Sequence, residues 1–257
     1  MNGLDENALV LFSMILMRMS GGIFLNPFLR RSEISQAVKA GMAFLLAILL
    51  YPLGEIPGME MENSLVFAMA LLQEFAVGAV MGFILELFVS VASMAGAIID
   101  LQMGFSFASV YDAGSGSQSA LSGTILYLYL GLFFFAADGH LAFIKLLAGI
   151  ADVLPYGAAL ELSGIVQAVL LIFKDCVMLA VKLAFPILAI EFIVGMAMGI
   201  MARVVSRVNL FILSIEVKIV IGLLVFVFMI APTGDFFGDI ITQALDALAQ
   251  VVSAIGR

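Results

Sequence analysis

The sequence of 257 residues has very few of the side chains from which catalytic and metal sites are built. It contains one histidine, one cysteine and no tryptophan. A single cysteine, Cys176, excludes an internal disulfide, and its place in an apolar run gives no indication of a metal cluster. His140 is the only histidine, so the chain cannot form a metal site of several histidines, and a catalytic triad would have no other histidine to use. We expect His140 to complete a hydrogen bond at a helix break rather than act as a base. The chain is therefore predicted not to be an enzyme and to hold no cofactor or metal.

Charged residues are also scarce. They make up 12% of the chain, whereas soluble domains carry about a quarter. Hydrophobic residues reach 64% and the mean hydropathy is +1.21, so the composition indicates an integral membrane protein. The net charge of −8 argues against nucleic-acid binding and against a polybasic membrane anchor. A cleaved signal peptide begins with a positively charged region, whereas this chain has Asp5 and Glu6 before its first apolar run. We therefore expect that run to be a membrane helix that is kept in the protein.

Hydrophobic runs separated by short connectors cover most of the chain, and we expect each run to be helical. As one helix, the run 65–99 would be about 52 Å long, against a hydrocarbon core of roughly 30 Å. It therefore either projects well beyond a bilayer or is not a simple span. We expect Pro186 to bend the run 165–205, and Pro232 to Asp235 to end the last run. The remaining runs are 8–25, 37–53, 121–150 (broken near Asp138-Gly139) and 210–231.

The terminal segment 235–255 has the period of an amphipathic helix. Its polar face is anionic, which favours docking on a partner protein over lying on acidic lipid. With no soluble domain or internal repeat in view, the predicted fold is an all-α membrane protein of long, bent helices and helical hairpins. The apolar face of the terminal helix would carry Phe237, Ile240, Ile241, Ala244, Leu245, Leu248, Val252 and Ile255.

Charged residues recur within or beside the apolar runs, where a charge at mid-bilayer costs about 2.5 to 3.5 kcal/mol even on a lenient scale. Near run ends, Lys39 and Lys145 can snorkel to the interface. Asp175 and Lys182 are seven residues apart and share a helical face, so they can pair. Candidates for facing a hydrated passage or another subunit are Glu86, Lys174 and Glu191. Four further charges lie within or beside the apolar runs, Arg18, Glu74, Glu216 and Lys218.

Two pairs of glycines have the GxxxG spacing, Gly78 with Gly82 and Gly195 with Gly199. This spacing lets helix backbones approach closely inside a membrane. The alternative is chance, since the chain has 24 glycines.

The most unusual stretch is 96–118. After Asp100 it stays apolar and aromatic, and it then enters Gly114-Ser115-Gly116-Ser117, which lacks the lysine of a phosphate loop and is predicted to be a flexible tether. Irregular backbone can lie at membrane depth only inside protein or along a cavity. Residue chemistry leaves two interpretations open, a buried loop facing an internal passage and a re-entrant segment that caps a helix pair. The candidate loop residues are Gln102, Met103, Gly104, Phe105, Ser106, Phe107, Tyr111, Asp112, Gly114 and Gly116.

The run Ile99-Asp100-Leu101-Gln102-Met103-Gly104-Phe105-Ser106-Phe107-Ala108 resembles the signature of the FliR family of flagellar biosynthetic proteins. This family has relatives in virulence-associated type III secretion. Asp138-Gly139-His140-Leu141 resembles the Asn-Gly-His-Leu element of the family, with Asp138 in place of Asn. A second departure is Ala113, where the family usually has Pro after the Asp.

The resemblance implies a core subunit of the flagellar type III export gate, in the inner membrane at the basal body. One copy would join FliP-type and FliQ-type subunits around a pore for unfolded protein substrates, with an FlhB-type switch protein outside. Residues 1–164 would form a FliP-like part, 165–231 a FliQ-like hairpin and 235–255 the terminal helix. The signature loop would plug the closed pore.

Three other functions remain open at this point. A secondary transporter could build a midplane ion site from Lys174, Asp175, Lys182 and Glu191 beside Pro186, although no inverted repeat is visible. A structural assembly factor would have a loop that never meets substrate. The third alternative is a virulence-associated relative, which the sequence does not separate from a flagellar one.

Overall fold

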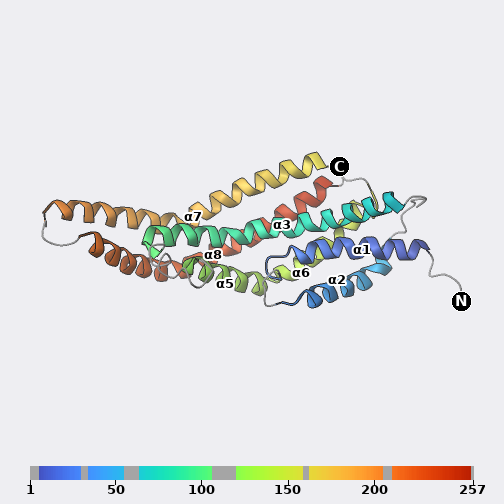
Figure 1. Ribbon diagram of the computed structural model, residues 1–257, viewed down its shortest axis with the longest axis horizontal. Coiled ribbons are helices and arrows are strands. Elements are labelled where there is room, and N and C mark those ends of the chain that lie inside the picture. The colour runs from blue at the N-terminus through green and yellow to red at the C-terminus, as the bar shows by residue number, and fades with distance from the viewer. Residues whose placement is uncertain are drawn as a thin grey trace. The chain divides into compact units, whose positions relative to one another are not determined.

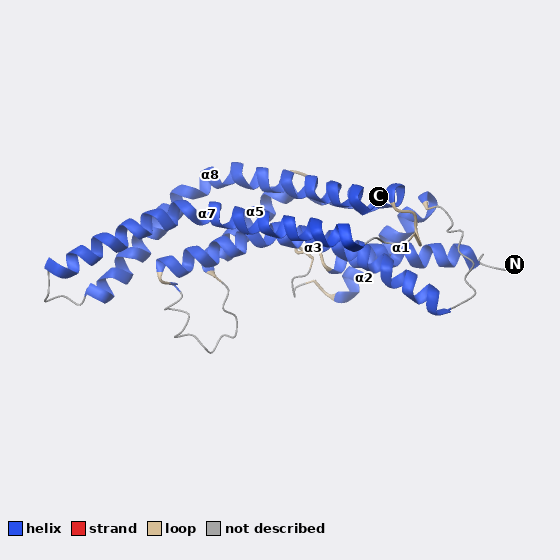
Figure 2. Ribbon diagram, turned by 90° about the horizontal axis from the view of Figure 1, so that it is seen from above, coloured by secondary structure: helices blue, strands red, loops and turns tan. Residues whose placement is uncertain are grey.

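The computed structural model describes residues 6–29, 34–54, 64–105, 120–158, 162–204 and 210–255. Within these ranges the chain is helical with no strand (Figure 2), which confirms the predicted all-α class. The helices, labelled in Figure 1, are α1 Glu6–Phe24, α2 Gln36–Leu50, the short 3₁₀ helix Tyr51–Leu53, α3 Ser64–Met103, α5 Leu121–Ala136, α6 Gly139–Val153, α7 Leu162–Val204 and α8 Leu210–Ile255.

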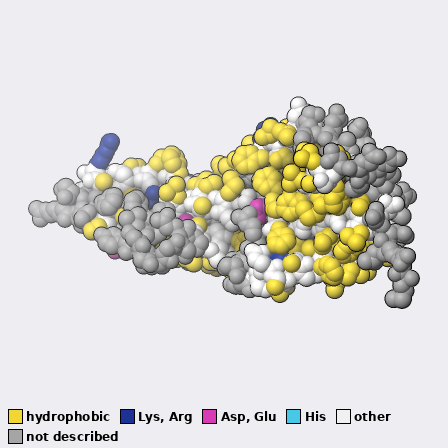
Figure 3. Space-filling view, turned by 45° about the vertical axis from the view of Figure 1, so that its right-hand side comes forward, with side chains coloured by type: hydrophobic (Ala, Val, Ile, Leu, Met, Phe, Trp, Pro, Cys, Tyr) yellow, Lys and Arg dark blue, Asp and Glu magenta, His cyan; other side chains and the backbone are white. Residues whose placement is uncertain are grey.

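Four of the described helices, α1, α3, α7 and α8, are long and apolar enough to cross a membrane. The pair α5 and α6, which is broken at Ala137 and Asp138, passes the same test as a unit and makes a fifth candidate. The chain is therefore a multi-pass membrane protein. Figure 3 shows mostly apolar side chains on the described part of the face that it draws, as a lipid or protein environment requires.

Three helices are longer than a bilayer needs. The 40 residues of α3 form one helix about 60 Å long, so the predicted over-long run is continuous. The 43 residues of α7 continue through Pro186. The predicted end of the last run at Pro232 is wrong, because α8 continues through it to Ile255. Pro232 has no N–H to donate to the Phe228 carbonyl four residues earlier, and next to it the Thr233 hydroxyl donates to the Met229 carbonyl (2.7 Å).

Contacts divide the described residues into two compact units. The first lies within Met1–Phe88, Asp138–Phe173 and Ile241–Arg257, and the second within Val89–Ala137 and Lys174–Ile240. The correspondence of 1–164 and 165–231 to FliP-like and FliQ-like parts stays a prediction.

In the first unit, glycines bring the backbones of α1 and α3 together. A Cβ on Gly78 would overlap the Arg18 carbonyl, and one on Gly82 would lie 2.9 Å from Leu25 Cβ and 3.0 Å from the Gly22 carbonyl oxygen. The pair Gly78 and Gly82 thus lies at a helix crossing. On its other side α1 packs against α2, where the Phe12 and Phe44 rings meet edge to face with centroids 5.6 Å apart.

In the second unit, the pair Gly195 and Gly199 lies differently. Among the described atoms nothing is within 4 Å of a Cβ on Gly199, and the nearest atoms to one on Gly195 belong to the Lys218 side chain at 3.8 Å. This pair therefore makes no backbone crossing within the described chain. The crossing in this unit joins Gly96 of α3 to Gly123 of α5, where an added Cβ on Gly96 would overlap the Gly123 backbone.

The terminal half of α8 buries the face that the period predicts. Leu245 is half-buried on the same face, and the side chain of Ile255 lies outside the described residues. Since this chain itself covers the face, a partner is not needed to cover it, which corrects the expectation of docking. The buried residues are Phe237, Ile240, Ile241, Ala244, Leu248 and Val252.

Candidate gate site at the end of the signature

The signature spans the end of α3. The helix ends at Met103, and Gly104 follows with φ 88° in the left-handed region that favours glycine. Gln102 and Phe105 are half-buried. The chain thus turns away from α3 directly after Met103. Six further candidate loop residues lie outside the described residues, so their placement stays a prediction: Ser106, Phe107, Tyr111, Asp112, Gly114 and Gly116.

Asp100 of the signature caps the next helix. Its carboxylate oxygens accept a hydrogen bond from the backbone N–H of Ser122 at 3.3 and 3.2 Å, in a buried setting. The first N–H groups of a helix lack partners and carry the positive end of its dipole. The residue at the N-cap of α5 is Ala120, which has no side chain that could cap. An acid on α3 therefore fixes the start of α5, and so the point where the connector 106–119 ends.

The close approach of Gly96 to Gly123 supports this cap. Gly96 and Asp100 are one turn apart on α3, and Gly123 directly follows Ser122 on α5. A side chain at Gly96 would separate the two helices and lengthen the bonds from Asp100. Neither contact was predicted, because each joins residues more than 20 positions apart. The only sequence signal was an acid at the end of an apolar run.

Met103 lies in a socket on the hairpin of α7 and α8. It is 0% exposed, and a Cβ added to Gly222 of α8 would lie 2.5 Å from Met103 Cγ and 3.0 Å from its Sδ. The same Cβ would lie 2.9 Å from Oε1 of Glu191 on α7. We call Met103, Glu191 and Gly222 the Met103 socket. Only glycine at position 222 leaves room for the other two side chains.

Glu191 is the buried acid of this socket. It is 0% exposed, and neither of its carboxylate oxygens has a hydrogen-bond partner among the described residues. Lys218 of α8 is the charged group that acts on it electrostatically. The Lys218 Nζ lies 3.8 Å from the position of a Cβ on Gly195, which is one turn beyond Glu191 on α7. In the described part of the chain the two groups form no ion pair.

The remaining charges of the membrane helices are distributed unevenly. Lys174, Asp175 and Lys182 are exposed, and no ion pair joins Asp175 to Lys182 within the described residues, which corrects that expectation. Seven residues of helix separate them by about 10 Å. Since Glu191 is buried and these three are exposed, the four do not share one buried ion site. Glu86 is half-buried.

The two lysines predicted to snorkel also differ. Lys145 is exposed, and its snorkelling stays a prediction. Lys39 is buried at 3% exposure, because it shares a face of α2 with Ala43 and Ala47, and α2 packs against α1. Snorkelling of Lys39 is therefore not observed.

A buried ion pair joins α1 to α3. Arg18, 0% exposed, donates through Nε to Glu74 Oε2 (2.5 Å) and through Nη1 to the Leu154 carbonyl (3.1 Å). Glu74 Oε1 accepts from the Gly157 N–H (2.8 Å). The guanidinium carbon lies 4.3 Å from the centroid of the Tyr156 ring, and burial raises the pKa of the Tyr156 hydroxyl above its ordinary value.

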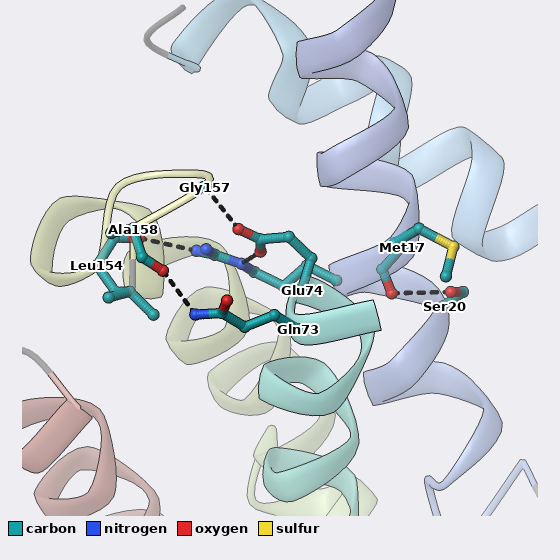
Figure 4. A network of polar contacts seen from close by, with 8 residues as sticks. Met17, Ser20, Gln73, Glu74, Leu154, Gly157 and Ala158 are labelled. Carbon is teal, nitrogen blue, oxygen red and sulfur yellow. Dashed lines mark hydrogen bonds and ion pairs between the residues drawn. The ribbon is translucent and has the colours of Figure 1, made fainter. Parts of the chain in front are cut away.

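This network holds the turn after α6. Beside Glu74, the Gln73 amide donates to the Ala158 carbonyl (2.7 Å), so both residues of α3 bond the same turn (Figure 4). Sequence reasoning identified Arg18 and Glu74 as costly charges but not as partners, since 56 positions separate them.

The break between α5 and α6 lies at Asp138-Gly139-His140-Leu141, the element that resembles the Asn-Gly-His-Leu of the FliR family. Asp138 has φ 54° and ψ 24°, a left-handed conformation that Asn and Asp adopt more readily than other non-glycine residues. Its carbonyl accepts from the N–H groups of Leu141 and Ala142, both at 3.0 Å. Asp in place of Asn therefore preserves the local backbone. His140 lies in the first turn of α6, beside this break.

The apolar helices are long enough to span a membrane, and the charges of Arg18, Glu74 and Asp100 are buried and bonded inside the chain. Together these features define the class of protein. It is an all-α, multi-pass membrane protein whose helices are joined by buried polar contacts.

Comparison with known sequences gives the family. The chain belongs to the bacterial export proteins, family 1, whose model matches residues 9–244. It is 23% identical to the flagellar biosynthetic protein FliR of Bacillus subtilis, covering 95% of both chains. It is 25% identical to FliR of Escherichia coli (93% and 92% covered) and 26% identical to FliR of Borreliella burgdorferi (99% and 96% covered). The resemblance indicated by the signature is confirmed.

Proposed function

We propose that this chain is a core subunit of the flagellar type III protein export gate, in the bacterial inner membrane at the basal body. We further propose that the connector after Met103 plugs the pore of the idle gate. Family membership supports the first statement and favours a transport component over an enzyme or a small-solute carrier. The anchoring of both ends of the connector supports the second.

A plug must be held at its ends and be free to move between them. At one end Met103 lies in its socket and Gly104 turns the chain, and at the other Asp100 caps α5. Asp100 and Met103, three residues apart on α3, thus hold the two ends of the connector.

The composition of the connector suits closure. Phe105, Phe107 and Tyr111 are large and stiff, so they occlude a passage at low entropic cost. Gly104, Gly114 and Gly116 allow the backbone to change conformation. Asp112 would hold the closed state by accepting bonds from nearby backbone N–H groups.

The partners in this proposal are FliP-type and FliQ-type membrane subunits, with an FlhB-type switch protein outside and unfolded protein substrates in transit. The exposed charges Lys174, Asp175 and Lys182 support protein neighbours, since they lie within the spanning part of α7, where lipid contact is costly. Large apolar side chains such as Phe185 and Phe192 are exposed on the same helix.

Removing Ser106 to Gly116 from the chain in the assembled complex tests the plug. We expect the cell membrane to become more permeable to ions while the partner subunits still co-purify. Replacing the same residues with a Gly/Ser segment of equal length is the matched control for chain length, and it should also leak. Intact assembly with unchanged permeability in both variants would overturn the plug.

A structural assembly factor is separated from a gate by crosslinking. A photo-crosslinker at Phe105, at the described start of the connector, should capture an export substrate arrested in transit. The same crosslinker in place of Lys145, on the exposed side of α6, should not capture the substrate. Capture at neither position by an arrested substrate would favour the assembly factor.

A further inference from the structure

Glu191 has no evident reason to be an acid in the gate site described above. The other buried acids of the membrane helices have partners, Glu74 in Arg18 and the Gly157 N–H, and Asp100 in the Ser122 N–H. Both carboxylate oxygens of Glu191 are buried without a partner among the described residues. A charged group in such a setting is very costly, and in proteins it either finds a counterion or becomes neutral.

Two elements besides its own helix α7 face the Glu191 carboxyl group, α3 and α8. Met103 of α3 and Glu191 meet at the position that a Cβ on Gly222 would occupy. This position is 3.0 Å from Met103 Sδ and 2.9 Å from Glu191 Oε1. From α8 comes Lys218, one turn before Gly222. The acid of α3 nearest to Met103 in sequence is Asp100, which is already bonded to Ser122.

Lys218 is placed to become the counterion of Glu191. Its ammonium group lies beside Gly195, on the same face of α7 as Glu191 and one turn away, a rise of about 5.4 Å. Changes of side-chain rotamer in two long, flexible side chains span that distance. In the structure, however, Glu191 Oε1 points at Gly222 and Met103 rather than at Lys218.

We propose that Glu191 is a proton-binding site that couples the charge state of the hairpin to the position of Met103. While Met103 is in its socket, Glu191 holds a proton and packs against it as a neutral acid. When Met103 leaves and water enters, Glu191 releases the proton to water, and the carboxylate pairs with the Lys218 ammonium. The inference rests on the proposed function, because it concerns how the plug is held and released.

The direction of the coupling follows from this cycle. An ionised Glu191 that keeps its place against Met103 would be buried and unpaired, and the rotamer that pairs it with Lys218 gives up the contact with Met103, so deprotonation favours departure of Met103. Release of the connector and release of the proton are therefore linked, and each changes the equilibrium of the other by the same factor. The lysine already acts on Glu191 electrostatically while Met103 is in its socket, and it stabilises the released state more, because there the two side chains form an ion pair.

The test uses the complete gate, assembled with its partners in membrane vesicles. Cys176 is the only cysteine and is replaced by alanine, and Phe105→Cys then reports the position of the connector by thiol labelling. Labelling is compared between chains with Glu191 and with Glu191→Gln, which keeps the shape of the neutral acid. The ratio of the two rates at each pH removes the pH dependence of the thiol itself.

We expect this ratio to be near one in mildly acidic buffer and to rise several-fold in mildly alkaline buffer. Lys218→Met in the Glu191 chain should abolish most of the rise. A ratio that does not change with pH overturns the inference, and so does a rise that Lys218→Met leaves intact. If Glu191→Gln does not assemble, labelling of the Lys218→Met chain serves as the reference. The two proposals can fail separately. If the labelling ratio does not change with pH, while deletion of Ser106 to Gly116 still makes the membrane leak, this inference is overturned and the plug is not.

Discussion

At the scale of single residues, glycine determines how closely helices and side chains meet in this protein. Gly222 stands beside Met103 and Glu191, and Gly78 beside the Arg18 carbonyl, so an added methyl group in either place must displace its neighbours. Gly199 has open space around it among the described atoms. Equal substitutions should therefore have very different effects.

Gly222→Ala should displace Met103 from its socket. Overpacking of this kind costs about 1 to 3 kcal/mol, and we expect the cost to appear as a leak, because the closed state contains the clash. Ion permeability of cells that carry the assembled gate measures it. Gly199→Ala is the matched control and should be silent, and equal permeability in the two variants would contradict the socket.

The buried pair of Arg18 and Glu74 should be intolerant of losing one partner. Glu74→Leu leaves the buried guanidinium without its acid, which costs about 3 to 5 kcal/mol. Loss of the assembled complex on heating measures this cost. The double variant Arg18→Met/Glu74→Leu should recover part of the loss, and a double variant less stable than Glu74→Leu would contradict the assignment.

At the scale of elements, caps and faces decide where helices begin and how they pack. The first turn of α5 depends on Asp100, which belongs to another helix. Asp100→Ala removes this cap, at a cost of about 0.5 to 2 kcal/mol. Amide hydrogen exchange at Ser122 and the next residues should become faster, while Leu126 and later residues of α5 keep their protection. Unchanged exchange at Ser122 would refute the cap.

The terminal half of α8 should contribute to the stability of this chain itself. Leu248 is fully buried, so Leu248→Ala should cost about 2 to 5 kcal/mol and lower the membrane yield of the chain. Gln250 is exposed, and Gln250→Ala should change stability by no more than about 0.5 kcal/mol. If Leu248→Ala accumulated like the parent while losing the partner subunits that Gln250→Ala keeps, this face would be a docking surface instead.

At the scale of the whole molecule, the exposed surface indicates dependence on partners. The spanning part of α7 exposes Lys174, Asp175 and Lys182 together with large apolar side chains. Neither lipid nor detergent satisfies such a mixture. We expect the isolated chain to be polydisperse and sensitive to protease in mild detergent, and co-expression with FliP-type and FliQ-type subunits to correct both. A monodisperse, protease-resistant isolated chain would exclude this.

The sequence by itself determined the class, the family and most of the helices. Within a bilayer the backbone must satisfy its own hydrogen bonds, so an apolar run of sufficient length is helical almost regardless of its neighbours. For the same reason α7 and α8 continue through Pro186 and Pro232, and the expected end at Pro232 was an error carried over from the behaviour of proline in water. The signature identified the family because it is a local pattern.

Only the tertiary structure decided which charge meets which partner. The pairing of Arg18 with Glu74, the capping of α5 by Asp100 and the place of Glu191 beside Met103 join residues that lie 22 to 88 positions apart. The period of one helix says which face is buried but not what lies opposite. Lys39 shows this, since its place near a run end suggested snorkelling, and the packing of α2 on α1 buried it. Such pairings depend on how separate helices pack together, and that is set by the whole chain at once rather than by any one stretch of it.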